Sequence, residues 1–178
     1  MANRSYLYSA DSLPTEKDNP QSIRCISEHN WDIPLAHELL VGYGTTVVPS
    51  MIWNGPLCVA GDYRPGADLL TGLLRVVGEG EVPDRPAFEE MVTRTVEHLE
   101  KQKARYFLLE PGEIFALHED DPAQGVARLP GDIELSVKRA EAALNGGEQE
   151  WVESLRRKWP DHFGSFYADY LYYSFPQD

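Results

Sequence analysis

The feature that most constrains the fold is a run of side chains at helical spacing between Asp84 and Tyr106. Its core-facing members recur at three- and four-residue intervals and are Phe88, Met91, Val92, Thr95, Val96, Leu99 and Tyr106. Asp84 is a candidate N-cap, Pro86 lies in the first turn, and basic residues occupy the last turns. We expect the longest helix here. Because an apolar stripe needs partners on other elements, we place this helix at the centre of the core.

Two N-terminal segments are predicted to pair as strands. Residues 3–9 are rich in β-formers, and residues 22–27 alternate in polarity, with a polar, proline-bounded loop between them. A further short buried strand is predicted at 57–60, just before Gly61. The chain therefore contains a small sheet.

Further helices are predicted on both sides of the central one. The first follows Asp32 as N-cap and carries Leu35, Leu39 and Leu40. A second follows Pro65 and carries Leu69, Leu70, Leu73, Leu74 and Val77. A third opens at Gly131-Asp132 and carries Ile133, Val137, Ala140 and Leu144. Two short helices close the fold, the first with Trp151, Val152, Leu155 and Trp159, the second with Phe163, Phe166, Tyr167, Tyr170 and Leu171.

Two segments admit more than one structure. The apolar run 47–53 contains Pro49, which is compatible with an edge strand or with a short helix, and we favour the helix. Residues 107–109 and 114–117 flank a Pro-Gly turn, which predicts a hairpin, with a helix as the alternative for the second run. The predicted fold is a single α+β domain over residues 1–178, mostly helical, with a small antiparallel or mixed sheet.

Composition and charge narrow the functional classes. An apolar fraction of 42% is too high for a disordered chain, and no apolar run approaches the ~20 residues of a membrane span. The opening residues lack the apolar region of a secretory signal, so we expect a cytoplasmic protein with Cys25 and Cys58 reduced. A formal net charge of −13 disfavours binding to nucleic acid or an anionic membrane and leaves two interpretations, solubility or a basic partner.

Local motifs do not predict catalysis, a metal or a cofactor. Glu110, Glu113 and the run His118 to Asp121 offer possible cation ligands, but their spacing lacks the pattern of a calcium loop, which favours a solvated acidic loop. Glu28-His29 and His37-Glu38 have no recognisable nucleophile beside them. The segments Gly42-Tyr43-Gly44 and Gly78-Glu79-Gly80 are typical of helix ends, because no phosphate-loop context follows either one.

Acidic and aromatic residues are the candidate partner contacts. The acids form two blocks, Glu79, Glu81, Asp84, Glu89 and Glu90 in the first, and Glu119, Asp120 and Asp121 in the second. The helix dipole accounts for Asp84, Glu89 and Glu90, but not for the others. Near the C-terminus, Tyr172 and Tyr173 lie partly outside the predicted helical stripe, and tyrosines commonly anchor interfaces.

Three segments carry a resemblance to known proteins. Asn3-Arg4-Ser5-Tyr6-Leu7-Tyr8-Ser9, Trp31-Asp32-Ile33-Pro34-Leu35 and Ala60-Gly61-Asp62-Tyr63 resemble a family of uncharacterised bacterial cytoplasmic proteins. This resemblance covers roughly the first 75 residues and implies no activity or site. In size, acidity and lack of catalytic motifs, the chain is also similar to the immunity proteins that bacteria pair with interbacterial toxins.

Three functional hypotheses follow. The first is an immunity-type inhibitor that binds a basic, cytoplasm-acting toxin, such as a nuclease, through its acidic residues. The second is an enzyme or small-molecule-binding protein whose site gathers distant residues, namely His29, His37, Glu110 and His118. The third is a homodimer that associates through the aromatic tail.

Overall fold

An antiparallel sheet forms one layer of the structure. The computed structural model describes residues 3–164 and the backbone of residues 172–174. In chain order, the strands are β1 (Arg4–Ala10), β2 (Ser22–Asn30), β3 (Thr46–Val48), β4 (Cys58–Asp62), β5 (Tyr106–Glu110) and β6 (Tyr172–Ser174). Their order across the sheet is β3-β4-β5-β1-β2-β6, and every neighbouring pair is antiparallel. The predicted pairing of the first two strands is confirmed.

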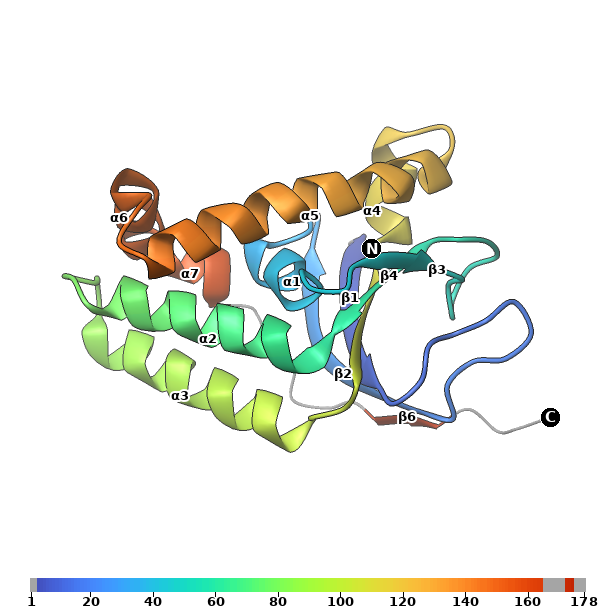
Figure 1. The fold of residues 1–178 in the computed structure, drawn as a ribbon, viewed down its shortest axis with the longest axis horizontal. Coiled ribbons are helices and arrows are strands. Elements are labelled where there is room, and N and C mark those ends of the chain that lie inside the picture. Colours follow the sequence, from blue (N-terminus) through green and yellow to red (C-terminus); the bar gives the residue numbers. More distant parts are fainter. Residues whose placement is uncertain (1–2, 165–171, 175–178) are drawn as a thin grey trace.

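Helices form the other layer and continue beyond the sheet. They are α1 (Leu35–Leu40), α2 (Tyr63–Gly78), α3 (Arg85–Lys101), α4 (Gly112–His118), α5 (Pro122–Leu144), α6 (Gln149–Arg157) and α7 (Trp159–Phe163). In Figure 1, α2, α3 and α5 run alongside one another and extend past the sheet to the end where α6 and α7 lie. The predicted α+β class, with more helix than strand, is confirmed. None of these helices is long and apolar enough to cross a membrane.

The sheet buries apolar side chains on both faces. The face toward the helices carries Leu7, Ile26, Val59, Phe107 and Leu109, which belong to the main core. The opposite face carries Tyr8, Ala10, Ile23, Cys25, Val48, Cys58, Ala60 and Leu108, with Leu13 and Met51 packed against them. Successive strand residues point to opposite faces, so one strand supplies both sets. Cys25 and Cys58 are buried free thiols, as expected.

Helix α2, not α3, is central to the main core. It packs against α1, α3, α5, α6 and strand β4, whereas the principal helix partner of α3 is α2. Tyr63 at the start of α2 stacks on Phe107 of β5, with ring centroids 3.9 Å apart. The predicted central helix also ends earlier, at Lys101, because Tyr106 begins β5. A single stripe needs only one apolar neighbour, and α3 satisfies this need at the edge of the helical layer.

Close backbone approach fixes the position of α2 against α1. A Cβ atom at Gly66 would lie 2.0 Å from the carbonyl oxygen of Leu40, so a larger residue would push the two helices apart. In the sheet, the β1–β2 register shifts between Leu7 and Tyr8. The shift leaves Ile26 without a partner on β1, and its carbonyl accepts a hydrogen bond from His98 of α3 at 2.9 Å.

Several predicted elements differ in the structure. Residues 46–48 form edge strand β3, the alternative to the favoured helix from Pro49, and residues 49–57 are a loop. Pairing with β4 satisfies the backbone groups of β3, and Pro49 ends the strand. Residues 112–118 form helix α4, which confirms the alternative to the hairpin. Helix α1 begins after Pro34, and Asp32 bonds the neighbouring backbone N–H of Ile33 instead of capping the helix.

The longest helix is α5, and it starts nine residues before the predicted opening at Gly131. Asp121 caps its first turn by accepting from the Ala123 N–H at 3.1 Å, with Pro122 in the first position. Pro130 lies inside the helix, one residue before the predicted opening. The acidic loop is consequently shorter than expected.

The two predicted C-terminal helices correspond to α6 and α7, but their boundary lies at Lys158, so Trp159, predicted in the first helix, begins the second. Trp159 and Phe163 are buried in the main core, and the Trp159 indole donates to the Pro83 carbonyl at 2.8 Å. The positions predicted for the remainder of the last helix, 165–171, lie outside the described residues. Residues 172–174 form strand β6, which pairs with residues 22–24 of β2.

Replacing Leu73 by alanine tests the central position of α2. Leu73 is fully buried in the core, so Leu73→Ala is expected to lower the free energy of unfolding by about 2–5 kcal/mol. Leu135→Ala is the matched control, because that side chain is 66% exposed and its loss is expected to change stability by less than about 0.5 kcal/mol. Urea unfolding followed by circular dichroism measures both values, and equal losses would contradict the assignment.

Candidate functional site

The histidine positions predicted as candidate catalytic residues fall partly in the core. His37 of α1 is fully buried, and both ring nitrogens are hydrogen-bonded. Its Nδ1 lies 2.9 Å from the Ser5 hydroxyl of β1, and its Nε2 lies 2.8 Å from the Ser27 hydroxyl of β2. One nitrogen donates and the other accepts, so a neutral imidazole satisfies both contacts. His37 therefore joins α1 to two strands, and no substrate reaches it in this conformation.

Burial sets the protonation of His37. Loss of hydration lowers the pKa of His37 to about 3, and neighbouring His29, with its ring centroid 6.4 Å away, lowers it further. Burial also lowers the pKa of His29. His37 is therefore neutral near physiological pH, and its two serine partners lie 32 and 10 residues away in sequence. No local motif could have indicated them.

The four residues of the enzyme hypothesis do not form one pocket. His29 and His37 lie together, but Glu110 is on the opposite face of the sheet, in register with Tyr6. His118 is exposed at the end of α4. Within residues 3–164, no three histidine, cysteine or acidic side chains are arranged to hold a metal ion. Glu113 instead accepts from the Arg4 backbone N–H at 2.9 Å.

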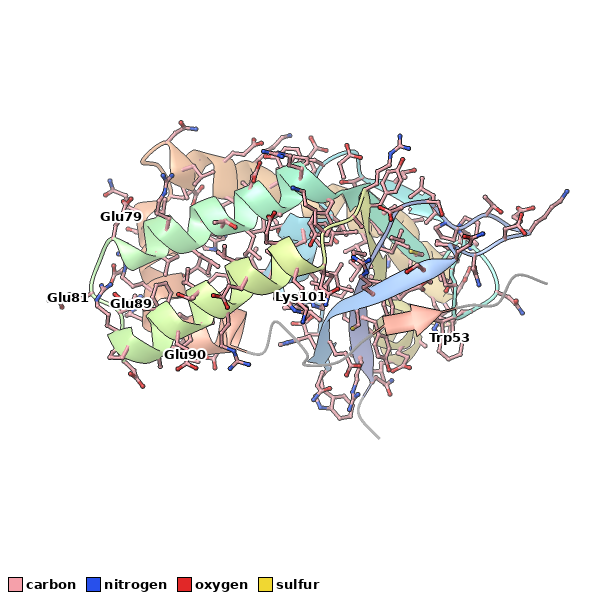
Figure 2. The ribbon with its side chains drawn as sticks, turned by 90° about the horizontal axis from the view of Figure 1, so that it is seen from below. Trp53, Glu79, Glu81, Glu89, Glu90 and Lys101 are labelled. Carbon is pink, nitrogen blue, oxygen red and sulfur yellow. The ribbon has the colours of Figure 1, made fainter. Side chains whose placement is uncertain are left out.

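The first acidic block forms one end of the molecule. Glu79 caps the end of α2, Glu81 lies in the turn, and Glu89 and Glu90 lie in the first turns of α3, all exposed. Figure 2 shows these four side chains at the end of the helical layer, far from Trp53. Asp84 is also exposed and caps α3 through the Ala87 N–H, as predicted. We call Glu79, Glu81, Asp84, Glu89 and Glu90 the acidic end.

Two nearby arginines donate to backbone carbonyls at the end of α2 and in the turn that follows it. Arg156 of α6 donates to the carbonyls of Val77 and Val76 at 2.7 and 3.0 Å and pairs with Glu153 at 2.6 Å. Arg85 donates to the carbonyls of Gly78 and Gly80. Cations are stabilised at the negative end of a helix dipole, so these contacts hold both guanidinium groups beside the last turn of α2. Arg85 also pairs with Glu89 at 3.7 Å, while Glu79, Glu81 and Glu90 are exposed to solvent. The sequence pattern had not indicated either arginine.

A hollow lies beside the acidic end. It has a volume of about 800 Å³ between α2, the α5–α6 turn and α6, and Glu79 is part of its wall. Val76 and Val152 contribute apolar surface, Glu150 and Glu153 contribute carboxylates, and Arg156 and Arg157 contribute positive charge. This end of the molecule therefore combines projecting acids with a concave surface.

The second acidic block lies elsewhere; Asp120 is exposed, and the other two acids have partners within the chain. Glu119 pairs with Arg128, and Asp121 caps α5. Helix α5 has 23 residues and so spans about 34 Å, which separates this block from the end where α5 meets α6. Figure 1 shows the α4–α5 turn and the α2–α3 turn at different ends of the molecule. The structure does not join the two predicted blocks into one surface.

The two predicted tyrosine contacts belong to strand β6. The backbone of Tyr172 pairs with that of Arg24, and the backbone of Tyr173 pairs with that of Ile23. Their side chains lie outside the described part of the chain. A role for Tyr172 and Tyr173 in partner binding remains a prediction.

Comparison with known proteins identifies a family. Residues 11–150 match the family described as "Domain of unknown function (DUF7822)". The chain belongs to this family. The matched range includes the acidic end, His37 and Glu110, but not β1 or the C-terminal strand. No curated protein and no solved structure matches the chain. Membership of DUF7822 brings no activity with it, so the functional argument depends on the surface itself.

The buried state of His37 predicts a pH-dependent stability difference. The folded-state pKa of about 3 lies below the unfolded value near ~6.5, so stability from neutral His37 is complete above that value and lost as pH falls toward 3. Compared with His37→Gln, the wild type is expected to lose up to about 1.4 kcal/mol per pH unit below pH ~6.5. Chemical denaturation between pH 7.5 and 4.5 measures this difference. A difference that stays constant with pH would contradict the neutral assignment, and Leu135→Ala supplies a non-titrating control.

Proposed function

We propose that this DUF7822 protein is a binding module of the immunity type, which inhibits a basic, cytoplasm-acting toxin by covering its substrate groove. The observation that carries the proposal is the acidic end, where Glu79, Glu81, Glu89 and Glu90 project to solvent. A toxin that acts on nucleic acid needs a basic groove, and opposed charges steer the two surfaces together.

The local disposition of charge supports this proposal. Arg156 is engaged with two carbonyls of α2, so it does not screen the exposed acids as a freely projecting cation would, whereas Arg85 pairs with Glu89 at 3.7 Å and screens that one acid. The adjoining hollow offers a concave seat with both apolar and charged walls, and buried apolar contacts slow dissociation of a complex. The acidic end could therefore attract a basic partner by its charge, and the adjoining hollow could provide the contact surface.

The alternative functions lack a comparable observation. The enzyme hypothesis required His29, His37, Glu110 and His118 around one pocket, and these residues lie at three separate places. The homodimer hypothesis rests on aromatic side chains outside the described residues. Among the three hypotheses, only the binding of a basic partner uses the exposed carboxylates of the acidic end.

Identification of the partner is the first test. The tagged protein is used to capture partners from extracts of the organism that encodes it, and mass spectrometry identifies what is retained at low salt. One basic protein is expected, together with loss of that protein's toxic activity when the two are mixed. Recovery of the tagged chain alone, or of a partner whose activity is unaffected, would contradict the inhibitor proposal.

Charge neutralisation tests the surface. One variant carries Glu79→Gln, Glu81→Gln, Glu89→Gln and Glu90→Gln. The matched control removes the same charge from exposed positions elsewhere and carries Asp68→Asn, Glu97→Gln, Asp132→Asn and Glu134→Gln. At low salt, the first variant is expected to associate with the captured partner about tenfold more slowly, because steering is lost, and the control less than about twofold more slowly. Surface plasmon resonance measures both rates, and equal slowing would show that net charge, not the acidic end, drives encounter.

A further inference from the structure

The loop between β3 and β4, residues 49–57, is held by one buried carboxyl group. Glu110 at the end of β5 is 1% exposed. Its Oε2 accepts from the Ser50 hydroxyl at 2.6 Å, and its Oε1 accepts from the Met51 backbone N–H at 2.8 Å. The Cys58 thiol at the start of β4 also bonds this carboxyl. Both oxygens of Glu110 are therefore acceptors, which suits an ionised carboxylate.

Ser50 connects Glu110 to the tip of the loop, which is formed by Ile52 and Trp53. While donating to Glu110, its hydroxyl oxygen accepts from the backbone N–H groups of Ile52 at 3.0 Å and Trp53 at 2.9 Å. A hydroxyl has one donor and two acceptor positions, so all three are in use. The conformation of the tip is consequently coupled to the state of Glu110.

The tip presents apolar surface and borders a hollow. Ile52 and Trp53 are 46% and 45% exposed, and the hollow of about 550 Å³ lies between this loop and residues 15–19. Trp53 also lies against Gly112, two residues after Glu110. Figure 2 shows Trp53 at the opposite end of the molecule from the acidic end. The loop is thus a separate surface from the one proposed to bind a toxin.

Protonation of Glu110 creates a conflict in this network. A proton on Oε1 would face the Met51 N–H, which is also a donor. A proton on Oε2 would face the Ser50 hydroxyl, whose two acceptor positions already serve Ile52 and Trp53. A proton aimed at either donor therefore breaks one of these bonds, and a proton in another direction leaves them as bonds to a neutral carboxyl, which are about half as strong as bonds to a carboxylate.

We propose that Glu110 is a proton-controlled latch for residues 49–57, which holds the Ile52–Trp53 tip in place when ionised and releases it when protonated. The latch is a conformational device that does not depend on the proposed inhibitor function. Its physical basis is the single carboxyl that accepts from the loop at two points and, through Ser50, governs two further backbone bonds.

Burial places the switch near neutral pH. Loss of hydration raises the pKa of Glu110 to about 7, although the bonds from Ser50, Met51 and Cys58 lower it. The loop itself has no titratable side chain. The titratable and charged groups that face the site from neighbouring elements are Cys58 on β4, Tyr6 on β1, Glu113 on α4, and Glu16, Lys17 and Asp18 across the hollow. Burial raises the pKa of Cys58 and of Tyr6, so both stay protonated while Glu110 titrates.

The global and local effects of protonation have opposite signs. The folded-state pKa of Glu110 lies above the unfolded carboxyl value near ~4.3, so its contribution to stability is complete below that value and lost as pH rises through about 7. Acidification therefore strengthens the fold through this group while it loosens the loop. A readout confined to the loop is needed.

Fluorine NMR of the full chain labelled with 5-fluorotryptophan provides that readout. The chain has four tryptophans, and Trp53→Phe identifies the Trp53 resonance. Between pH 5.5 and 8.5, this resonance is expected to shift with a midpoint near 7. In Glu110→Gln, it is expected to stay at the low-pH position of the wild type at every pH. Glu38→Gln is the matched control, because burial also raises the pKa of Glu38 to about 7 but its carboxyl bonds Ser136 in the helical layer.

Two outcomes would overturn the latch. The first is a Trp53 resonance that does not titrate in the wild type, and the second is one that titrates equally in Glu110→Gln. If Glu110→Gln does not fold, Ser50→Ala gives an independent test. It retains the carboxyl but removes the hydroxyl that carries its state to Ile52 and Trp53. The titration shift of Trp53 is expected to fall by at least about half, and an unchanged shift would refute the proposal.

Discussion

Burial of α2 is the interaction on which the rest of the structure depends. The helix contacts the sheet through Tyr63 and Phe107 and packs against α1, α3, α5 and α6 along its length. Because it extends beyond the sheet, its last carbonyls lie where α6 can reach them, and Arg156 bonds two of them. The same extension places the α2–α3 turn, with its exposed carboxylates, at one end of the molecule. The candidate binding surface is thus a consequence of how the core is packed.

Two buried polar groups divide the remaining structural roles between the faces of the sheet. His37 lies on the helix side, where a neutral imidazole satisfies two hydroxyls and fixes α1. Glu110 lies on the other side, where both carboxyl oxygens accept bonds from the 49–57 loop. A neutral ring that is fully hydrogen-bonded gains nothing from a proton, whereas a buried carboxylate relieves its desolvation by taking one. His37 therefore has a constant structural role, whereas Glu110 is suited to a change of protonation state.

The segments that sequence analysis identified correctly have strong local signals. Residues 4–10 and 22–30 alternate as strands, and the stripe of α2 and the cap of α3 at Asp84 follow known spacing rules. The errors occur where distant contacts overrule local preference. Pairing with β4 makes a strand of residues 46–48, and packing against α1, α2 and α4 carries α5 through Pro130. Among the candidate site residues, exposure of the acids was foreseen, but their division between two ends was not.

By itself, the sequence determined the α+β class, most of the elements and the excess of acidic charge, because these follow from side-chain periodicity and composition. Only the tertiary structure decided that α2 is central, that Arg156 bonds the last carbonyls of α2, and that Ser5 and Ser27 flank His37. It also joined Glu110 to Ser50, which is 60 residues away. Such contacts join groups far apart in the chain, and their energies depend on burial and on hydrogen-bond geometry, which arise when the elements pack.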